Sequence, residues 1–256
     1  MTNYFALAIA LCAPLFAQEK EWISLFNGKN LDGWTPKIKG QKMGVNLHNT
    51  FRVEDGILKC EYDQYPSFDR QFGHLYSDLA YSHYILRMEY KFVGKMMPDA
   101  PHYVNLNSGI MFHSQPPQSM TLDQGFPVSI EFQFLADLGK GPRPTGNVCT
   151  PGTHIEQDGK LLTEHIIKAS TENLAADQWV SIELEVHGNE LVIHRVNGKE
   201  VLRYQKPQLD PKGHVVSTEA LLKAGAPIPL SFGHIALQAE GQPVWFRKIE
   251  LKKLKE

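Results

Sequence analysis

The stretch Val128-Ser-Ile-Glu131-Phe-Gln133-Phe-Leu135 alternates strictly between two sets of side chains. One set is wholly apolar and consists of Val128, Ile130, Phe132 and Phe134. This period of two predicts a β-strand with one face in a hydrophobic core. The opposite face carries the carboxyl group of Glu131 and the carboxamide of Gln133, which a strand places side by side, about 7 Å apart. We therefore expect this strand to form the floor of a polar binding groove.

Short runs of the same kind, separated by turn residues, follow one another along the chain. Residues 51–54 with 57–61, 84–92, 107–113, 180–186, 234–240 and 244–254 all fit strands. The clearest hairpin joins 191–196 to 200–204, because the Asn197-Gly198 between them suits a type I′ turn. One short helix is expected at 218–224, capped by Ser217 or Thr218 and ended by Gly225. The pattern predicts an all-β sandwich or barrel.

Two long connections, 136–177 and 205–232, interrupt this regularity. Connections of such length inside a compact domain are usually functional or disordered. The first leaves directly from strand 128–135, is rich in glycine and proline, and contains His154. We expect this connection to lie beside the groove.

The overall composition limits the possible partners. The chain has 256 residues, of which 42% are hydrophobic and 21% charged, and its formal net charge is −2. Only the tail at 247–255 is basic. Nucleic acid and anionic membranes are therefore poor candidates as partners.

Residues 1–17 have the character of a signal peptide. The apolar run 4–16 is too short to cross a bilayer, and Ala17 is a small residue at which cleavage could occur. We expect an exported protein, periplasmic or extracellular, without a transmembrane segment and with residues 18–256 as a single domain. A lipid anchor at Cys12 is the less favoured alternative, because Leu11 before it is bulky for a lipobox.

Two cysteines, Cys60 and Cys149, remain after such a cleavage. In an exported protein they could form a disulfide. Equally, Cys60 could be a small core residue of its strand. The spacing of the two residues leaves both alternatives open.

Several catalytic motifs are missing from the sequence. There is no P-loop, no GxSxG, no HExxH and no EF-hand loop, which argues against nucleotide and serine-hydrolase chemistry. The pattern Glu-x-Asp-x-x-Glu of laminarinase-like glycosidases is also missing, since its second and third acids would fall on Gln133 and Ala136. A retaining mechanism with two carboxylates therefore has no obvious pair on this strand.

A series of strings, in order and at consistent spacing, resembles the 3-keto-disaccharide hydrolase domain family. These strings cover nearly all of the chain after residue 17. They are Leu25-Phe-Asn-Gly-Lys-Asn-Leu-Asp-Gly-Trp34, Val53-Glu-Asp-Gly-Ile-Leu58, Asn107-Ser-Gly-Ile110, Glu131-Phe-Gln133, Gln178-Trp-Val180, Val196-Asn-Gly198, Leu237-Gln238 and Val244-Trp-Phe-Arg-Lys-Ile249.

The resemblance implies a concanavalin A-like jelly-roll β-sandwich of two antiparallel sheets, with one concave groove. It also implies an exported carbohydrate-active enzyme that cleaves glycosides whose sugar carries a ketone at C3. Such a ketone acidifies the C2 proton, so a base can remove it, the C1 substituent can leave, and water can then add. This chemistry requires a general base, a group that stabilises the enolate oxygen, and an acid or cation near the leaving group.

The resemblance and the strand pattern together suggest roles for specific residues. Glu131 is the first candidate for the base or for a metal ligand, and His154 and His113 are further catalytic candidates. A divalent metal ion is a candidate cofactor, with Glu131 and His154 as its first candidate ligands. Many family members carry a histidine where this chain has Ala239-Glu240. The candidate contacts to an oligosaccharide or glycoside substrate are Asn107, Gln133, Gln238, Glu240, Arg52 and Tyr76.

Two other functions fit the same pattern. The first is a carbohydrate-binding module without chemistry, because one sandwich fold serves both enzymes and lectins. The second is a conventional hydrolase of unoxidised glucan. Turnover of a 3-keto-disaccharide, compared with that of its unoxidised parent, separates the three hypotheses.

Overall fold

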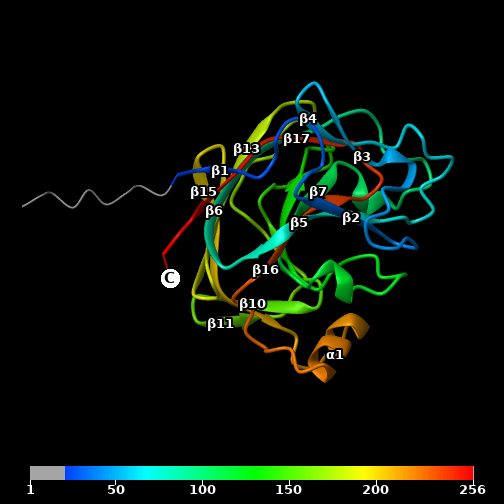
Figure 1. The fold of residues 1–256 in the computed structure, drawn as a ribbon. Coiled ribbons are helices and arrows are strands. Elements are labelled where there is room, and N and C mark those ends of the chain that lie inside the picture. The colour runs from blue at the N-terminus through cyan, green and yellow to red at the C-terminus, as the bar shows by residue number, and fades with distance from the viewer. Residues whose placement is uncertain (1–20, 256) are drawn as a thin grey trace, which may run out of the picture.

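The computed structural model describes residues 21–255, so the expected signal peptide and Cys12 lie outside the described residues. Within this range the chain folds into two antiparallel β-sheets (Figure 1). The ten-stranded sheet has the order β11 (Lys160–Leu162), β10 (Thr153–Gln157), β15 (Lys199–Leu209), β14 (Leu191–Val196), β13 (Val180–His187), β6 (His83–Phe92), β17 (Val244–Lys253), β4 (Ile57–Cys60) and β3 (Phe51–Glu54), with β1 (Ile23–Ser24) pairing β17.

The seven-stranded sheet forms the second layer. Its order is β12 (Ile166–Ile167), β9 (Val148–Cys149), β8 (Ile130–Leu135), β7 (Asn107–Ser114), β16 (Gly233–Ala239), β5 (Gly73–Tyr81) and β2 (Trp34–Ile38). The helical segments are short: η1 (Leu47–Asn49), η2 (His102–Val104), η3 (Pro117–Ser119) and α1 (Val216–Lys223). The expected concanavalin A-like sandwich is confirmed.

The hydrophobic core lies between the two sheets and contains the apolar face of β8. The ring of Phe134 on β8 stacks on Tyr90 of β6 with the ring centroids 4.2 Å apart. Phe132 stacks in the same way on His194 of β14 at 4.0 Å. The alternation of residues 128–135 is therefore confirmed, with regular pairing limited to Ile130–Leu135. Because the apolar face lies in the core, Glu131 and Gln133 are directed to the other side of the sheet.

The expected hairpins are confirmed, and Asn197 and Gly198 have positive φ angles of 49° and 77° in the turn between β14 and β15. The expectation that 136–177 is an irregular connection is wrong, because it contains the short strands β9, β10, β11 and β12. Strand β15 likewise extends into the second connection as far as Leu209. These strands add to the edges of the two sheets and form walls beside β8.

Helix α1 begins two residues earlier than expected and lies at the same end of the molecule as β10 and β11 (Figure 1). Its N-cap is Val215, without a capping side chain, so the prediction of Ser217 or Thr218 as cap is wrong. The hydroxyl of Thr218 instead donates a hydrogen bond to the carbonyl oxygen of Gly152, at 3.0 Å. The helix is thereby tied to the loop that precedes β10.

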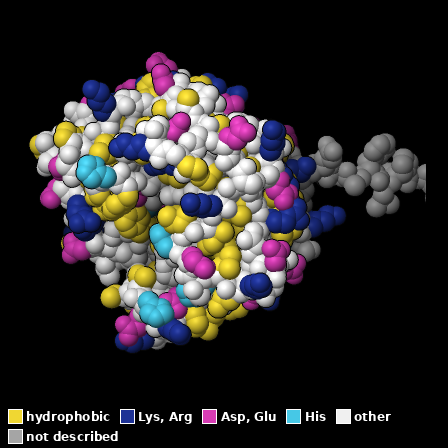
Figure 2. Space-filling view, turned by 180° about the vertical axis from the view of Figure 1, so that it is seen from behind, with side chains coloured by type: hydrophobic (Ala, Val, Ile, Leu, Met, Phe, Trp, Pro, Cys, Tyr) yellow, Lys and Arg dark blue, Asp and Glu magenta, His cyan; other side chains and the backbone are white. Residues whose placement is uncertain are grey.

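Cys60 and Cys149 are both buried and both free, and they lie on different sheets. Cys60 belongs to the main core, which agrees with the second of the two alternatives for this residue. No helix among residues 21–255 is long and apolar enough to cross a membrane. On the face drawn in Figure 2, acidic and basic side chains are interspersed.

Candidate active site

A cavity of about 1110 Å³ lies over the outer face of the seven-stranded sheet. Strands β7, β8, β9 and β16 contribute polar side chains to it, and the segments around 138–154, 163–168 and 210–217 line it further. Three of the lining side chains are large, apolar and exposed: Tyr103, Ile166 and Val215. The cavity therefore combines a polar sheet surface with apolar side chains that solvent reaches, as small-molecule sites commonly do.

Glu131 lies on the central strand of this surface and is only 6% exposed. Its carboxyl group lies over Gly109 of the neighbouring strand β7, where a Cβ atom would approach Oε1 to 2.6 Å. The absence of a side chain at Gly109 thus provides the space for this carboxyl group. Burial raises the pKa of Glu131 to about 8, and a hydrogen bond from the Cys149 thiol partly opposes this rise. A carboxyl group with such a pKa can exchange a proton near neutral pH.

A second group of polar side chains lies on β7 and at the end of β16, and three of its atoms have no hydrogen-bond partner. These buried oxygens are Oδ1 of Asn107, Oε1 of Gln238 and Oε2 of Glu240. Burial, and then the nearby charge of Glu131, raises the pKa of Glu240 well above its usual range. A buried acceptor without a donor is costly, so this corner of the cavity favours a ligand that supplies hydroxyl groups.

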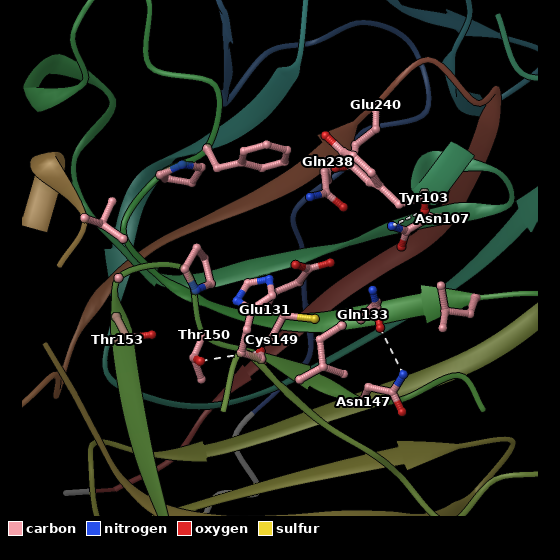
Figure 3. Close-up of a pocket in the computed structure, with 18 of the residues that line it drawn as sticks. Tyr103, Asn107, Glu131, Gln133, Asn147, Cys149, Thr150, Thr153, Gln238 and Glu240 are labelled. Atoms are coloured by element: carbon pink, nitrogen blue, oxygen red, sulfur yellow. Dashed lines mark hydrogen bonds between the residues drawn. The ribbon is translucent and has the colours of Figure 1, made fainter. Parts of the chain in front are cut away.

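Gln133 faces the cavity beside Glu131, and its amide is held from the loop before β9. The side-chain nitrogen of Asn147 donates a hydrogen bond to Oε1 of Gln133, at 2.9 Å (Figure 3). Oδ1 of Asn147 in turn accepts from the backbone N–H of Ala169, at 2.9 Å. In Figure 3 the amide nitrogen of Gln133 points away from Asn147.

His154 lies in the cavity wall on β10, next to a buried aspartate. Its Nε2 is 3.3 Å from Oδ1 of Asp210, and its Nδ1 has no partner. The register of β10 against β15 shifts between His154 and Glu156, and such a bulge redirects a side chain. Asp210 also accepts hydrogen bonds from the backbone N–H groups of Lys212 and His214 and lies 2.6 Å from Nδ1 of His214.

Replacing Asp210 by asparagine is expected to destabilise the fold in a pH-dependent way. Burial would raise the pKa of Asp210, but the N–H groups and the His214 ring outweigh it and lower the pKa to about 2. The folded state therefore favours the ionised form, and this stabilisation is present above about pH 4 and lost as the pH falls towards 2. We expect Asp210→Asn to cost about 1–2 kcal/mol at pH 7 after solvent screening. Urea unfolding should show a smaller difference in the free energy of unfolding between wild type and Asp210→Asn at pH 2.5 than at pH 7. An equal difference at both pH values would contradict the ionised state assigned to Asp210.

Six of the nine residues predicted from the sequence line this cavity: Glu131, Gln133, His154, Asn107, Gln238 and Glu240. The other three do not. His113, a catalytic candidate from the sequence, has a positive φ of 45° that breaks the alternation of β7. Its Nε2 lies 2.9 Å from the carbonyl oxygen of Gly188, which belongs to the turn between β13 and β14.

Arg52 and Tyr76 are placed away from the cavity for different reasons. Arg52 lies on β3 of the other sheet and forms ion pairs with Asp63 at 2.7 Å and Glu54 at 2.8 Å. Tyr76 lies on β5 but is fully buried, with its hydroxyl 2.9 Å from the sulfur of Met120. Neither is available to a ligand in the cavity.

The two candidate metal ligands, Glu131 and His154, line the same cavity. Within the described range 21–255, however, no group of three or more His, Cys, Asp and Glu side chains is arranged to hold a metal ion. The protein groups therefore do not fit a metal centre of that composition.

Two residues of the site carried no clear signal in the sequence. Asn147 lies in a glycine-rich loop, and nothing in its neighbourhood indicates that its side chain reaches Gln133. Asp210 precedes Pro-Lys-Gly, which predicts a turn but gives no sign of a carboxylate beside a histidine 56 positions earlier. Both depend on contacts that are distant in sequence.

Comparisons with known proteins agree with this architecture. Two solved structures of candidate glycosyl hydrolases from Parabacteroides distasonis are similar to the chain. One has a TM-score of 0.55 and 16% identity, covering 91% of this chain and 94% of its own. The other has a TM-score of 0.56 and 17% identity, covering 91% and 100%. At these identities the likeness shows the fold alone.

The search of curated proteins finds no match to the chain. The model of one family, described as the 3-keto-alpha-glucoside-1,2-lyase-like domain, matches residues 21–252. This range contains every residue that lines the cavity. The chain therefore belongs to the 3-keto-alpha-glucoside-1,2-lyase-like domain family, a family of carbohydrate-active proteins.

Proposed function

We propose that the protein cleaves the glycosidic bond of 3-keto-glycosides by removing the proton at C2, eliminating the C1 substituent and then adding water. The observation that carries this proposal is Glu131, a buried carboxyl group with a pKa of about 8 in a cavity with unpartnered polar atoms. The acidified C2–H of a 3-keto sugar needs a base of this kind. We also propose that the protein acts after export, as residues 1–17 suggest.

The Glu131 carboxylate takes the C2 proton, and the C–H electron pair forms a C2–C3 double bond as the ketone becomes an enolate. When the C3 carbonyl re-forms, a C1–C2 double bond replaces the C1–O bond, and the aglycone oxygen takes up a proton. We assign the supply of that proton to His154, and its proximity to Asp210 supports this assignment. Water then adds across the double bond, which makes the net change a hydrolysis.

The polar corner of the cavity fits the substrate in this reaction. Asn107, Gln238 and Glu240 each present a buried oxygen without a hydrogen-bond partner, and the hydroxyl groups of a sugar, which both donate and accept, can supply these partners. The exposed side chains of Tyr103 and Ile166 offer apolar surface to the faces of the substrate rings. The sugar would thus lie over the sheet with its C2 side towards Glu131.

A direct test is to incubate the purified protein with a 3-keto-disaccharide and, separately, with its unoxidised parent. Turnover of the keto form alone is the expected result. Binding of either sugar without turnover would favour a carbohydrate-binding module, and cleavage of the parent would favour a conventional glucan hydrolase. Either of these outcomes overturns the proposal.

The pH dependence of the reaction should follow Glu131. The base must be ionised to act, and kcat/KM reports ionisation in the free enzyme. Since the pKa of Glu131 is about 8, kcat/KM for a 3-keto-glycoside whose leaving group departs without protonation, such as a nitrophenolate, is expected to rise about tenfold per pH unit below pH 8 and to level off above it. Initial rates between pH 5.5 and pH 9.5 measure this. A profile that levels off near pH 5 would contradict the role of Glu131 as the base.

A further inference from the structure

The orientation of the Gln133 amide can be deduced from its hydrogen-bond partners. A backbone N–H can only donate, so the atom of Asn147 that faces Ala169 must be its oxygen. The other end of the Asn147 amide is then the NH₂ group, which donates to Gln133. The atom of Gln133 that receives this bond must be Oε1. Gln133 therefore has its NH₂ group left over, and within residues 21–255 this group donates no side-chain hydrogen bond.

Asn147 is itself fixed by the backbone around it. Its carbonyl oxygen accepts from the N–H of Gln133 at 3.0 Å, and the N–H of Gly146 donates to the carbonyl of Gln133 at 2.9 Å. The carbonyl of Gly146 lies 2.9 Å from Nδ1 of the buried His194. Gly146 has a φ of +95°, and a Cβ there would lie 2.8 Å from Val201. This part of the loop is closely packed, so Asn147 has little freedom to turn.

The NH₂ group of Gln133 belongs to the residue beside the proposed base, Glu131. Glu131 and Gln133 are two residues apart on one strand face, about 7 Å apart along the chain. A contact of about 2.9 Å from Glu131 to C2 and a hydrogen bond of about 2.9 Å from Gln133 to the C3 oxygen can span this separation together, because C2 and the C3 oxygen are only two bonds apart. A sugar with C2 at Glu131 can therefore place its C3 oxygen at Gln133. The NH₂ group of Gln133 is then a donor within reach of the oxygen on which the negative charge would form.

We propose that Gln133 is a catalytic residue that donates a hydrogen bond to the C3 oxygen as the ketone becomes an enolate, and that Asn147 is the positioning residue that turns its NH₂ group towards that oxygen. This inference rests on the proposed function. As the C2 proton passes to Glu131, the C–H pair forms the C2–C3 double bond and the carbonyl pair moves onto oxygen. The N–H of Gln133 then meets a full negative charge instead of a carbonyl dipole, so its effect is larger on the transition state than on the bound substrate.

The main test replaces Asn147 by aspartate. The new carboxylate can still accept from Ala169, but it has no N–H for Oε1 of Gln133. The Gln133 amide is then expected to turn over and present its oxygen to the cavity, which lowers kcat/KM for a 3-keto-disaccharide by about 10²-fold. Protonation of the carboxyl group restores a donor to Oε1. The ratio of variant to wild-type kcat/KM, measured at each pH, should therefore rise at least tenfold from pH 8.5 to pH 5.

Asn173→Asp is the matched control for this pH effect. Oδ1 of Asn173 also accepts a backbone N–H, from Arg143, and its NH₂ also donates to a side chain, that of Asp137, but it does not line the cavity. Its ratio to the wild type is expected to stay within about threefold and not to rise as the pH falls. A ratio for Asn147→Asp that is equally low at all pH values, or unchanged from the wild type, overturns the positioning role.

Gln133→Met tests the catalytic role directly, because methionine is similar in shape and has no N–H. We expect kcat to fall by about 10²–10³-fold. The inhibition constant of the unoxidised disaccharide should change by less than about threefold, because a C3 hydroxyl develops no charge. Equal losses in kcat and in inhibitor affinity would reduce Gln133 to a binding residue. A wild-type protein that turns over no 3-keto-glycoside overturns the proposed function itself, whereas an active wild type with unaffected variants overturns this inference alone.

Discussion

Glu131→Gln is expected to lower kcat for a 3-keto-disaccharide by about 10²–10⁴-fold, the contribution typical of a general base. The amide has nearly the same shape but cannot accept the C2 proton. The same change should stabilise the fold at alkaline pH. The pKa of Glu131 is about 8, above its usual value of 4.5, so the folded state holds a proton that the unfolded state releases. The free energy of unfolding therefore decreases as the pH rises from about 4.5 to 8, and a neutral amide avoids a loss on the order of 5 kcal/mol.

Initial rates and thermal unfolding at pH 5 and pH 9 measure the two effects together. Glu183→Gln is a suitable control, because Glu183 lies on β13 of the other sheet and forms an ion pair with Arg195 at 2.7 Å. The control should keep its activity and gain no stability at pH 9. A Glu131→Gln variant with wild-type kcat and an intact fold would remove this residue from the mechanism.

Gly109→Ala is expected to abolish most of the activity without touching a polar group. The added Cβ would lie 2.6 Å from Oε1 and 2.9 Å from Cγ of Glu131, and also 2.9 Å from the carbonyl oxygen of Phe132. The carboxyl group must move aside, and a shift of about 1 Å at a catalytic group can cost about 10²-fold in rate. Because the carbonyl belongs to the paired strand, we also expect a loss of about 1–3 kcal/mol in stability.

Gly125→Ala provides the comparison for this variant. Gly125 also lines the cavity, but its nearest heavy atom to a new Cβ is Cδ2 of Phe72 at 3.4 Å, an ordinary contact. Its rate should stay within about threefold of the wild type. Circular dichroism and urea unfolding establish that both variants are folded before their rates are compared. A fully active Gly109→Ala variant would show that the position of the Glu131 carboxyl group does not limit the reaction.

Local patterns in the sequence predict much of the fold. The alternation around Glu131 and the Asn197-Gly198 turn depend on neighbours within a few residues, so a period of two and a turn type suffice to predict them. The short strands β9 to β12 gave no such signal, because each has only two to five residues and forms by pairing with the edge of an existing sheet. Their glycine- and proline-rich surroundings resemble an irregular loop.

The site was predictable where a side chain follows the alternation of its strand. Glu131, Gln133 and Gln238 do so, and all three reach the cavity. His113 does not, because one residue with positive φ turns its ring towards Gly188. Asn147 contacts Gln133, and Asp210 contacts His154. Both come from other segments of the chain, and no local sequence pattern reveals these contacts. The three-dimensional structure was needed to identify the residues that contact the proposed catalytic groups.

The central claim, that Glu131 removes the C2 proton of a 3-keto sugar, is tested most directly with a 3-keto-disaccharide deuterated at C2. Incubation in ordinary water, with a sample without enzyme to correct for spontaneous exchange, followed by mass spectrometry of the released sugar, measures whether the label survives. The predicted result is loss of the C2 deuterium in every cleaved molecule, at a rate that falls about 10²–10⁴-fold in Glu131→Gln. Cleavage with the deuterium retained at C2, and with no slowing of cleavage by the label, would contradict proton abstraction and elimination.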